Sequence, residues 1–278
     1  MTTDPGRTAN LHTDAPRHAD RRPLRPFGTA IRIFIVLGLL LGLAACGDVA
    51  EDTAADTPTD TPVAPPPPTL DPEPPDPGGQ DAAGAAQTEL LALARRDADD
   101  PRALGPVDAP VVLLQFADLL CGVCAAFAAG DEATLIDTYV EPGLLRLEWW
   151  DLPFQGDDAL LAARAARAAG EQGAFWAYRD AVYAERLRRG DGRTTEALLA
   201  AIAADLDLDV EVFRADLADP QLPEAIAAEA AVGAELGFDR TPSLVIGGYA
   251  MNGLETLEVL TGVIDVALLD AGVAPPQR

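Results

Sequence analysis

Residues 111–124 have the sequence VVLLQFADLLCGVC, and this stretch decides the fold. Its first seven residues, 111–117, are almost continuously apolar, which is typical of a buried strand. The pattern then changes to one typical of a helix that begins near Gly122 and extends to Tyr139. A pair of cysteines, two residues apart, therefore lies where a strand is followed by a helix. We expect an α/β fold built around this junction.

This junction suits a reactive thiol. The N-terminus of a helix presents free N–H groups and a partial positive charge, which stabilise a thiolate and lower its pKa. The thiolate is the species that attacks in disulfide exchange. Cys121 is therefore predicted to attack, and Cys124 is predicted to resolve the mixed disulfide that results. Gly122 and Val123 complete the motif.

Three other interpretations of the cysteine pair remain open. A zinc site needs four ligands, but the sequence has no second cysteine pair, and its two histidines, His12 and His18, precede the globular part. A purely structural disulfide would close so short a loop that it would stabilise the fold little. Two buried, unreactive cysteines are the third alternative. The lack of histidine also argues against Ser–His and Cys–His hydrolase mechanisms, and neither a metal nor a cofactor is expected.

The strands expected after the junction fall into two groups. A second strand is predicted at residues 144–152, where Pro153 follows it. A short strand at 243–246 and a return strand at 249–251 are predicted to enclose a Gly-Gly hairpin turn. A closing helix is expected at 255–269. The order is a βαβ unit followed by a ββα unit.

A helical insertion is expected between these two units. An alanine-rich helix is predicted at 159–169, a second at 175–188 and a later one at 225–236. Side chains that can cap helix N-termini mark the starts of helices in this region. The candidate caps are Asp157 or Asp158, Thr194 or Thr195, and Asp209.

The N-terminal part of the sequence indicates export. Four arginines between residues 21 and 32 precede an apolar run of 13 residues, 33–45. A membrane-spanning helix needs about 20 apolar residues, so this run is typical of a signal peptide instead. It ends in Leu-Ala-Ala-Cys, which resembles a bacterial lipoprotein signal. Residues 1–45 are therefore expected to be the signal peptide and Cys46 the lipidated residue; a stray cysteine in a membrane anchor is the alternative.

Residues 46–88 are predicted to form a disordered tether behind that cysteine. They contain four consecutive prolines, 65–68, and almost no large apolar side chain. Such a stretch cannot bury enough surface to offset the entropy of ordering it. Residues 89–278 are then expected to form one domain.

The charge of the chain excludes one class of partner. The formal net charge is −25, and the part from Cys46 onward has 42 acidic residues against 14 arginines, a net charge of −28. Such a surface repels the phosphate backbone. Nucleic-acid binding is therefore not expected.

Five segments, in order along the chain, resemble the DsbA-like branch of the thioredoxin superfamily. The resemblance covers roughly residues 102–270 and implies a thioredoxin-like fold with a helical insertion between its two halves. It also implies that Pro242 is a cis-proline packed against the active-site disulfide, and that Thr241 pairs with a bound substrate strand. An ordinary trans-proline at the start of an edge strand is the alternative. The five segments are 104–110, 121–124, 151–153, 172–178 and 240–243.

Two positions depart from the pattern of that family. The strong oxidants carry a histidine between the cysteines, whereas this motif has Gly122 and Val123, so the pair is expected to be less oxidising. The position six residues before the first cysteine usually holds a buried acid. Here it is Gln115, whose amide cannot accept a proton from the resolving thiol. Asp118 is closer to the motif and is expected at the exposed end of the strand.

Together these features predict an extracytoplasmic thiol–disulfide oxidoreductase. Its expected partners are exported cysteine-containing proteins and a membrane redox partner, and the lipid on Cys46 would anchor it to the cell membrane. Donation of disulfides follows from the resemblance. A reductase or isomerase fed by a membrane thiol carrier is one alternative, and a tethered binding module with a structural CxxC is another. A monomer is expected.

Overall fold

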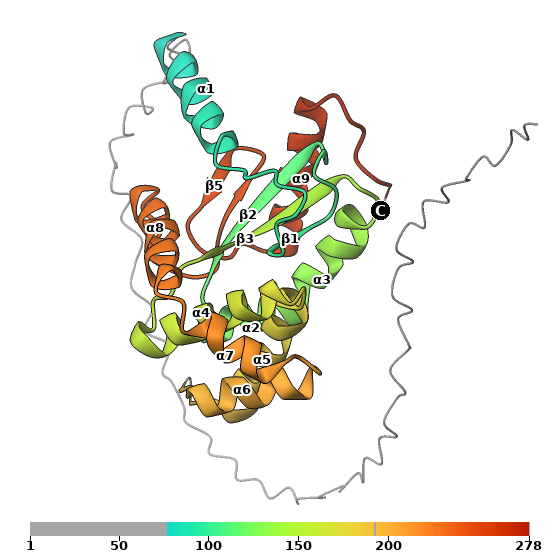
Figure 1. Cartoon of the computed structure of the whole chain (residues 1–278). Helices are drawn as coiled ribbons and strands as arrows, with labels where there is room; N and C mark the ends of the chain where they lie inside the picture. Colours follow the sequence, from blue (N-terminus) through green and yellow to red (C-terminus); the bar gives the residue numbers. More distant parts are fainter. Residues whose placement is uncertain (1–76, 192, 278) are drawn as a thin grey trace, which may run out of the picture. The chain divides into compact units, whose positions relative to one another are not determined.

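The computed structural model describes residues 77–191 and 193–277, in which a five-stranded mixed sheet has helices on both faces (Figure 1). Strand β2 (Val111–Ala117) is parallel to β3 (Leu145–Asp151), and every other neighbouring pair in the sheet is antiparallel. The predicted order of a βαβ unit and a ββα unit is confirmed. In spatial order the strands are β1 (Ala103–Leu104), β3 (Leu145–Asp151), β2 (Val111–Ala117), β4 (Ser243–Ile246) and β5 (Tyr249–Met251).

The sheet separates two apolar layers, because successive side chains of a strand point to opposite faces. One set of alternate β2 side chains packs against helix α9 (Leu257–Asp270) and the π-helical segment η1 (Ile136–Val140). The other set packs with α8 (Gln221–Glu235) and the end of α1 (Pro77–Leu91). The central strand β2 is therefore buried along its whole length.

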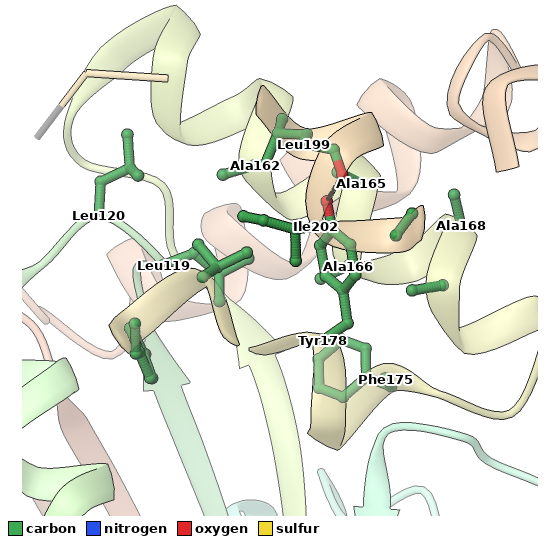
Figure 2. Packing of buried hydrophobic residues seen from close by; sticks show 14 of the residues in the cluster. Leu119, Leu120, Ala162, Ala165, Ala166, Ala168, Phe175, Tyr178, Leu199 and Ile202 are labelled. Atoms are coloured by element: carbon green, nitrogen blue, oxygen red, sulfur yellow. Dashed lines mark hydrogen bonds between the residues drawn. The ribbon is translucent and has the colours of Figure 1, made fainter. Parts of the chain in front are cut away.

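A third apolar core fills the helical insertion beyond the ends of β2 and β3 (Figure 2). All eight buried residues of α4 (Gly156–Glu171) are alanine or glycine. Bulk comes from its neighbours, including the aromatic rings of Phe175 and Tyr178, and the Tyr178 hydroxyl donates to the Leu199 carbonyl at 2.9 Å. Leu119 and Leu120, which lead into the CGVC motif, pack into this same core. The other helices of the insertion are α5 (Phe175–Arg189), α6 (Glu196–Asp205) and α7 (Val210–Leu217).

The predicted caps are correct in two of three places. Thr195 caps α6 by accepting from Leu198 N, and Asp209 caps α7 by accepting from two backbone N–H groups. The prediction for α4 was wrong, because Asp157 and Asp158 lie inside its first turn. In that position their carboxylates still interact favourably with the positive end of the helix dipole.

The helix predicted from Gly122 to Tyr139 is divided in the structure. Helix α2 (Gly122–Ala129) ends at Gly130, whose backbone (φ −127°, ψ −94°) is not helical, and α3 (Asp131–Leu135) starts directly after it. Glycine has the lowest helix propensity after proline, so it favours a break at this point. The predicted helix is therefore three consecutive segments, the last of which is η1.

Two elements were not predicted. Strand β1 has only two residues, too few for a periodic pattern. Helix α1 (Pro77–Leu91) is rich in alanine and glycine and has little apolar periodicity, so it was assigned to the disordered tether. The last residues assigned to the tether, 77–88, therefore lie in a helix in the structure. The Gln87 side chain donates to the Gly247 carbonyl at 3.3 Å, which attaches the end of α1 to the β4–β5 hairpin.

The N-terminal predictions fall on residues outside those that the structure describes. The signal peptide at 1–45, the lipidated Cys46 and the tether up to residue 76 stay predictions. Within residues 77–191 and 193–277, no helix has both the length and the apolar character needed to cross a bilayer.

Candidate functional site

Two thiols of different accessibility meet at the N-terminus of α2. Cys121 is the N-cap residue, with extended backbone (φ −74°, ψ 121°), and its Sγ accepts a hydrogen bond from Cys124 N at 3.3 Å. Cys121 is partly exposed, whereas Cys124 is fully buried, and both are free thiols. The sequence places the cap here because β2 ends at Ala117, and a short apolar turn through Leu119 and Leu120 leads into the helix.

The two thiols also differ in acidity. Hydrogen bonding from the Cys124 thiol, together with the Thr241 contact and the N–H groups at the start of α2, lowers the pKa of Cys121 to about 5 against the opposing effect of burial. Burial, and then the adjacent Cys121 thiolate, raise the pKa of Cys124 far above that of a free thiol. At neutral pH the accessible sulfur is therefore a thiolate and the buried sulfur is a thiol.

The loop before β4 lies directly against the reactive sulfur. The Thr241–Pro242 peptide bond is cis, as the resemblance to the DsbA-like branch implied. The Cys121 thiol lies 3.3 Å from the Thr241 carbonyl, to which it can donate. The Ser243 hydroxyl donates to the Arg240 carbonyl at 2.8 Å and accepts from Gly253 N at 3.0 Å, which fixes the loop from behind. The structure thus brings together residues 120 positions apart in the sequence.

This geometry, with a CxxC motif at a strand–helix junction facing a cis-proline, coincides with a match to a known family. A family model described as thioredoxin matches residues 97–266. The chain belongs to the thioredoxin family. The match includes the cysteine pair, the cis-proline loop and the helical insertion between them.

Individual proteins and solved structures also resemble this chain. Probable disulfide bond formation protein D of Bacillus anthracis is 28% identical over 155 residues, covering 54% of this chain and 71% of that protein. A thioredoxin-like oxidoreductase from Silicibacter pomeroyi DSS-3 aligns with a TM-score of 0.53 and 30% identity, covering 62% of this chain and 93% of that structure. Alpha-DsbA1 from Wolbachia pipientis shares the fold, with a TM-score of 0.55 at 21% identity, over 61% of this chain and 92% of that structure. The predicted DsbA-like resemblance and the class of thiol–disulfide oxidoreductases are thereby confirmed.

A further relative has a different name and a longer chain. Na⁺/H⁺ antiporter NhaA 3 of Salinispora tropica is 31% identical over 196 residues, which are 69% of this chain and 28% of the antiporter. The chain thus spans little more than a quarter of that relative's length.

Asp118 was expected at an exposed strand end, and this prediction was wrong. The residue is 2% exposed, and its carboxylate accepts from Leu120 N at 2.7 Å and from Gln155 N at 3.0 Å. Burial raises the pKa of Asp118, and the neighbouring Cys121 thiolate acts in the same direction. The carboxylate joins the turn before the motif to the loop after β3. A polar residue following an apolar strand gave no signal of this anchoring role.

Gln115, which stands where thioredoxin relatives usually have an acid, is fully buried on β2. Neither of its amide atoms makes a hydrogen bond of standard geometry. A buried carboxyl, Glu132 on α3, lies beside it and pairs with Arg179 of α5 at 2.8 Å. Burial raises the pKa of Glu132, and the Arg179 guanidinium opposes this. An acid is therefore present in this part of the core, but it comes from a different element and already has a cationic partner.

Sequence reasoning missed one cation beside the motif. Arg186, in the last turn of α5, donates from Nε to the Leu120 carbonyl at 2.7 Å. A Cβ atom built on Gly122 would lie 3.9 Å from its Nη2. Arg186 and Leu120 are 66 residues apart in the sequence, and no local pattern indicates that the two segments meet.

Proposed function

We propose that this protein is an extracytoplasmic disulfide donor that oxidises exported proteins through Cys121 and Cys124. The observation that carries the proposal is the inequality of the two thiols. An accessible sulfur with a pKa of about 5 is a good leaving group, and the buried partner cannot be reached by a second protein. A structural disulfide needs no such asymmetry.

The transfer proceeds in two exchanges. In the oxidised protein a substrate thiolate attacks Cys121 Sγ, the Cys121–Cys124 bond breaks, and the electron pair leaves on Cys124. That sulfur takes up a proton, since its pKa is raised. A second substrate thiolate then attacks the substrate sulfur of the mixed disulfide and releases Cys121 as a thiolate. Two substrate thiols are oxidised, one protein disulfide is reduced, and a membrane redox partner must restore it.

The cis-proline loop would hold the substrate during this exchange. Thr241 is only partly buried and its carbonyl lies 3.3 Å from Cys121 Sγ, so its backbone can pair with an extended segment joined to that sulfur. Pro242 is buried beside it and has no N–H to compete for that pairing. Main-chain pairing of this kind is independent of substrate sequence, which suits a donor that acts on many proteins.

The reduction potential of the Cys121–Cys124 pair tests the direction of transfer. A pKa of about 5 lies between the values of about 7 for thioredoxin and about 3.5 for the strong oxidant DsbA. We therefore expect a potential nearer to roughly −180 mV than to about −120 mV when the protein is equilibrated with glutathione buffers. A value near about −270 mV would instead indicate a reductase. A value below roughly −300 mV would favour the structural disulfide of a binding module.

Anchoring through Cys46 is a separate part of the proposal. The support is the Leu-Ala-Ala-Cys run after a 13-residue apolar stretch. Cys46→Ser should release the protein from membranes or leave its signal uncleaved, while Cys121→Ser serves as the matched control and should stay membrane-bound. Membrane retention of the Cys46→Ser variant with a cleaved signal would contradict the anchor.

A further inference from the structure

Arg186 lies beside the active-site motif and has no acidic partner among the described residues. Its Nε is held by the Leu120 carbonyl at 2.7 Å, but its two terminal nitrogens make no hydrogen bond or ion pair within the described part of the chain. They are not among the buried unpaired atoms either, so they are accessible to solvent. The guanidinium therefore has free donors beside Gly122, one residue from the reactive sulfur.

The two arginines that follow Arg186 on α5 are paired with acids, by contrast. Arg188 pairs with Glu185 at 2.6 Å, and Arg189 pairs with Asp191 at 3.2 Å. On the other side of the sulfur, the arginine that precedes Thr241 pairs with Asp239 at 2.8 Å. Arg193 also has no ion pair among the described residues and lines a small cavity with Leu120 and Arg186, but only Arg186 is hydrogen-bonded to the residue that precedes the motif.

The positive charge of Arg186 lies in a strongly acidic domain. From residue 89 onward the sequence has 33 acidic residues and 14 arginines, a net charge of −19. The main causes that lower the pKa of Cys121 do not include Arg186: they are the Cys124 thiol, the Thr241 contact and the N–H groups at the start of α2. A guanidinium with free N–H groups matches a carboxylate, which it can bind through two parallel hydrogen bonds.

We propose that Arg186 is a specificity-determining residue that favours substrates with an acidic side chain close to the reactive cysteine. The guanidinium lies beside Gly122, the residue next to the sulfur to which the peptide would be bonded, so side chains close to the peptide cysteine would come within its reach. The inference rests on the proposed disulfide-donor function and names a substrate class for it. The acidic domain repels an acidic peptide as a whole, whereas Arg186 attracts an acidic side chain that lies close to the peptide cysteine. The preference therefore depends on where the acidic residue stands in the peptide and not on the net charge of the peptide.

The test compares matched peptides with two cysteines, in which Asp, Asn or Arg occupies each of the three positions on either side of one cysteine. The oxidised full chain is mixed with each peptide, and the rate of peptide disulfide formation is measured by mass spectrometry. An acidic residue also changes the reactivity of the peptide itself. The informative quantity is therefore the Asp-to-Asn rate ratio in the wild type divided by the same ratio in a variant, in which that effect cancels.

At one position or more, the wild type should have an Asp-to-Asn ratio roughly two- to fivefold above that of Arg186→Gln, the range of a partly exposed ion pair. Arg186→Lys, which keeps the charge, should fall between them. Arg214→Gln removes an exposed, paired arginine on α7 and should match the wild type. The difference between the wild type and Arg186→Gln should shrink as salt rises from about 0.05 to about 0.5 M.

Equal ratios in the wild type and Arg186→Gln at all six positions would overturn the inference, provided that the Asn peptides are still oxidised. The same applies if Arg186→Lys behaves like Arg186→Gln while both remain folded by circular dichroism. If the wild type oxidises no Asn peptide at all, the proposed donor function fails and the inference falls with it. If Arg186→Gln reacts more slowly with all peptides to the same extent, Arg186 only positions Leu120. That result would also overturn the proposed preference for acidic substrates.

Discussion

The β1–β3 edge of the sheet and its active-site end both bury charged groups, but they compensate them differently. At the edge, carboxylates have arginine partners: Glu148 pairs with Arg146 at 2.8 Å, and Asp151 pairs with Arg167 at 2.6 Å. Glu229 of α8 joins this network through three arginines. Opposite charges therefore hold β3, α4, α8 and the segment after α1 together.

At the active-site end the charges lack ionic partners within the described residues. Asp118 accepts only from backbone N–H groups, and the Cys121 thiolate is hydrogen-bonded by a thiol and by N–H groups. Arg186 is bonded to a carbonyl. Charged groups that stabilise the fold are thus paired with opposite charges, whereas charged groups at the active site have no ionic partner and remain available to a substrate. A thiolate paired with a resident cation would be stabilised, but it would be hindered from meeting a substrate.

The largest effect should come from the two cysteines at the active-site end. Cys121→Ser should lower disulfide transfer to a dithiol peptide on the order of a thousandfold or more, because it removes the sulfur that is attacked. Cys124→Ser should instead accumulate mixed disulfides with substrate proteins through Cys121, while Cys121→Ser accumulates none. Non-reducing gels followed by mass spectrometry measure both. Similar accumulation in the two variants would show that the roles are wrongly assigned.

At the edge, the largest loss of stability should follow removal of Glu148. Its carboxylate accepts from Arg95 N at 2.8 Å, from Arg96 N at 3.0 Å and from Arg146 at 2.8 Å. Glu148→Ala should lower the free energy of unfolding by about 3–5 kcal/mol, since it leaves a buried cation uncompensated. Urea unfolding measures this loss.

The matched control for this variant is an exposed ion pair. Glu211→Ala breaks the contact with Arg214, in which the Glu211 side chain is 88% exposed, and should lower stability by less than about 1 kcal/mol. Neither variant should change the potential of the cysteine pair. Equal losses of stability, or a shifted potential in Glu148→Ala, would contradict the separation of the two regions.

The pH dependence of stability should differ between the redox forms. The pKa of Cys121 is about 5 in the folded protein and about 8.5 for a free thiol, so the unfolded reduced chain binds more protons between these values. The stability of the reduced form should therefore rise with pH across this window, by at most about 1.4 kcal/mol per unit, and be lost as pH falls through about 5. The raised pKa of Cys124 keeps that thiol protonated below pH ~8.5, so it contributes nothing there.

The contribution of the Cys121 thiolate to stability is measured as the difference between the melting temperatures of the reduced and oxidised forms at each pH. Carboxylates common to both forms largely cancel. Cys121→Ser cannot form the disulfide, and the pH dependence of its melting temperature should follow that of the oxidised wild type. A flat difference in the wild type would mean that the thiolate is not stabilised by the fold.

The smallest effect should follow from adding a cation to the motif. Val123 is 53% exposed, so a histidine fits there without displacing the core. Val123→His should raise the potential of the cysteine pair on the order of 30 mV below pH ~6.5, because an imidazolium favours the thiolate of the reduced form. Val123→Gln is the neutral control and should leave the potential near that of the wild type. A more reducing histidine variant would contradict the argument.

Much of the fold could be predicted because it depends on local patterns. The continuous apolar run of β2 and the Gly-Gly hairpin after β4 have clear signals, and both were placed correctly. Helix α1 has no such signal, because it is held by contacts with the distant β4–β5 hairpin. Its helical state depends on tertiary packing more than on its own sequence.

The site was only partly predictable for a related reason. Cys121 and Cys124 stand in a motif whose spacing is visible in the sequence, and the role of Pro242 was implied by the resemblance to the DsbA-like branch. Asp118 and Arg186 matter through what they contact, and those contacts are made across loops and helices. A polar residue after a strand, or an arginine in the last turn of a helix, has the same local pattern whether it faces solvent or the active site.

The small residues of α4 have a consequence for how this chain tolerates mutation. Its buried face consists of alanine and one glycine, against which the rings of neighbouring helices pack. A single base change in an alanine codon can give Val, Thr, Pro, Asp, Glu, Ser or Gly. The first five are too large, too polar or incompatible with a helix at a closely packed position, and the last two weaken the helix. Selection should therefore remove random substitutions from this helix more strongly than from β2, where single base changes in valine and leucine codons can give other apolar side chains of similar volume.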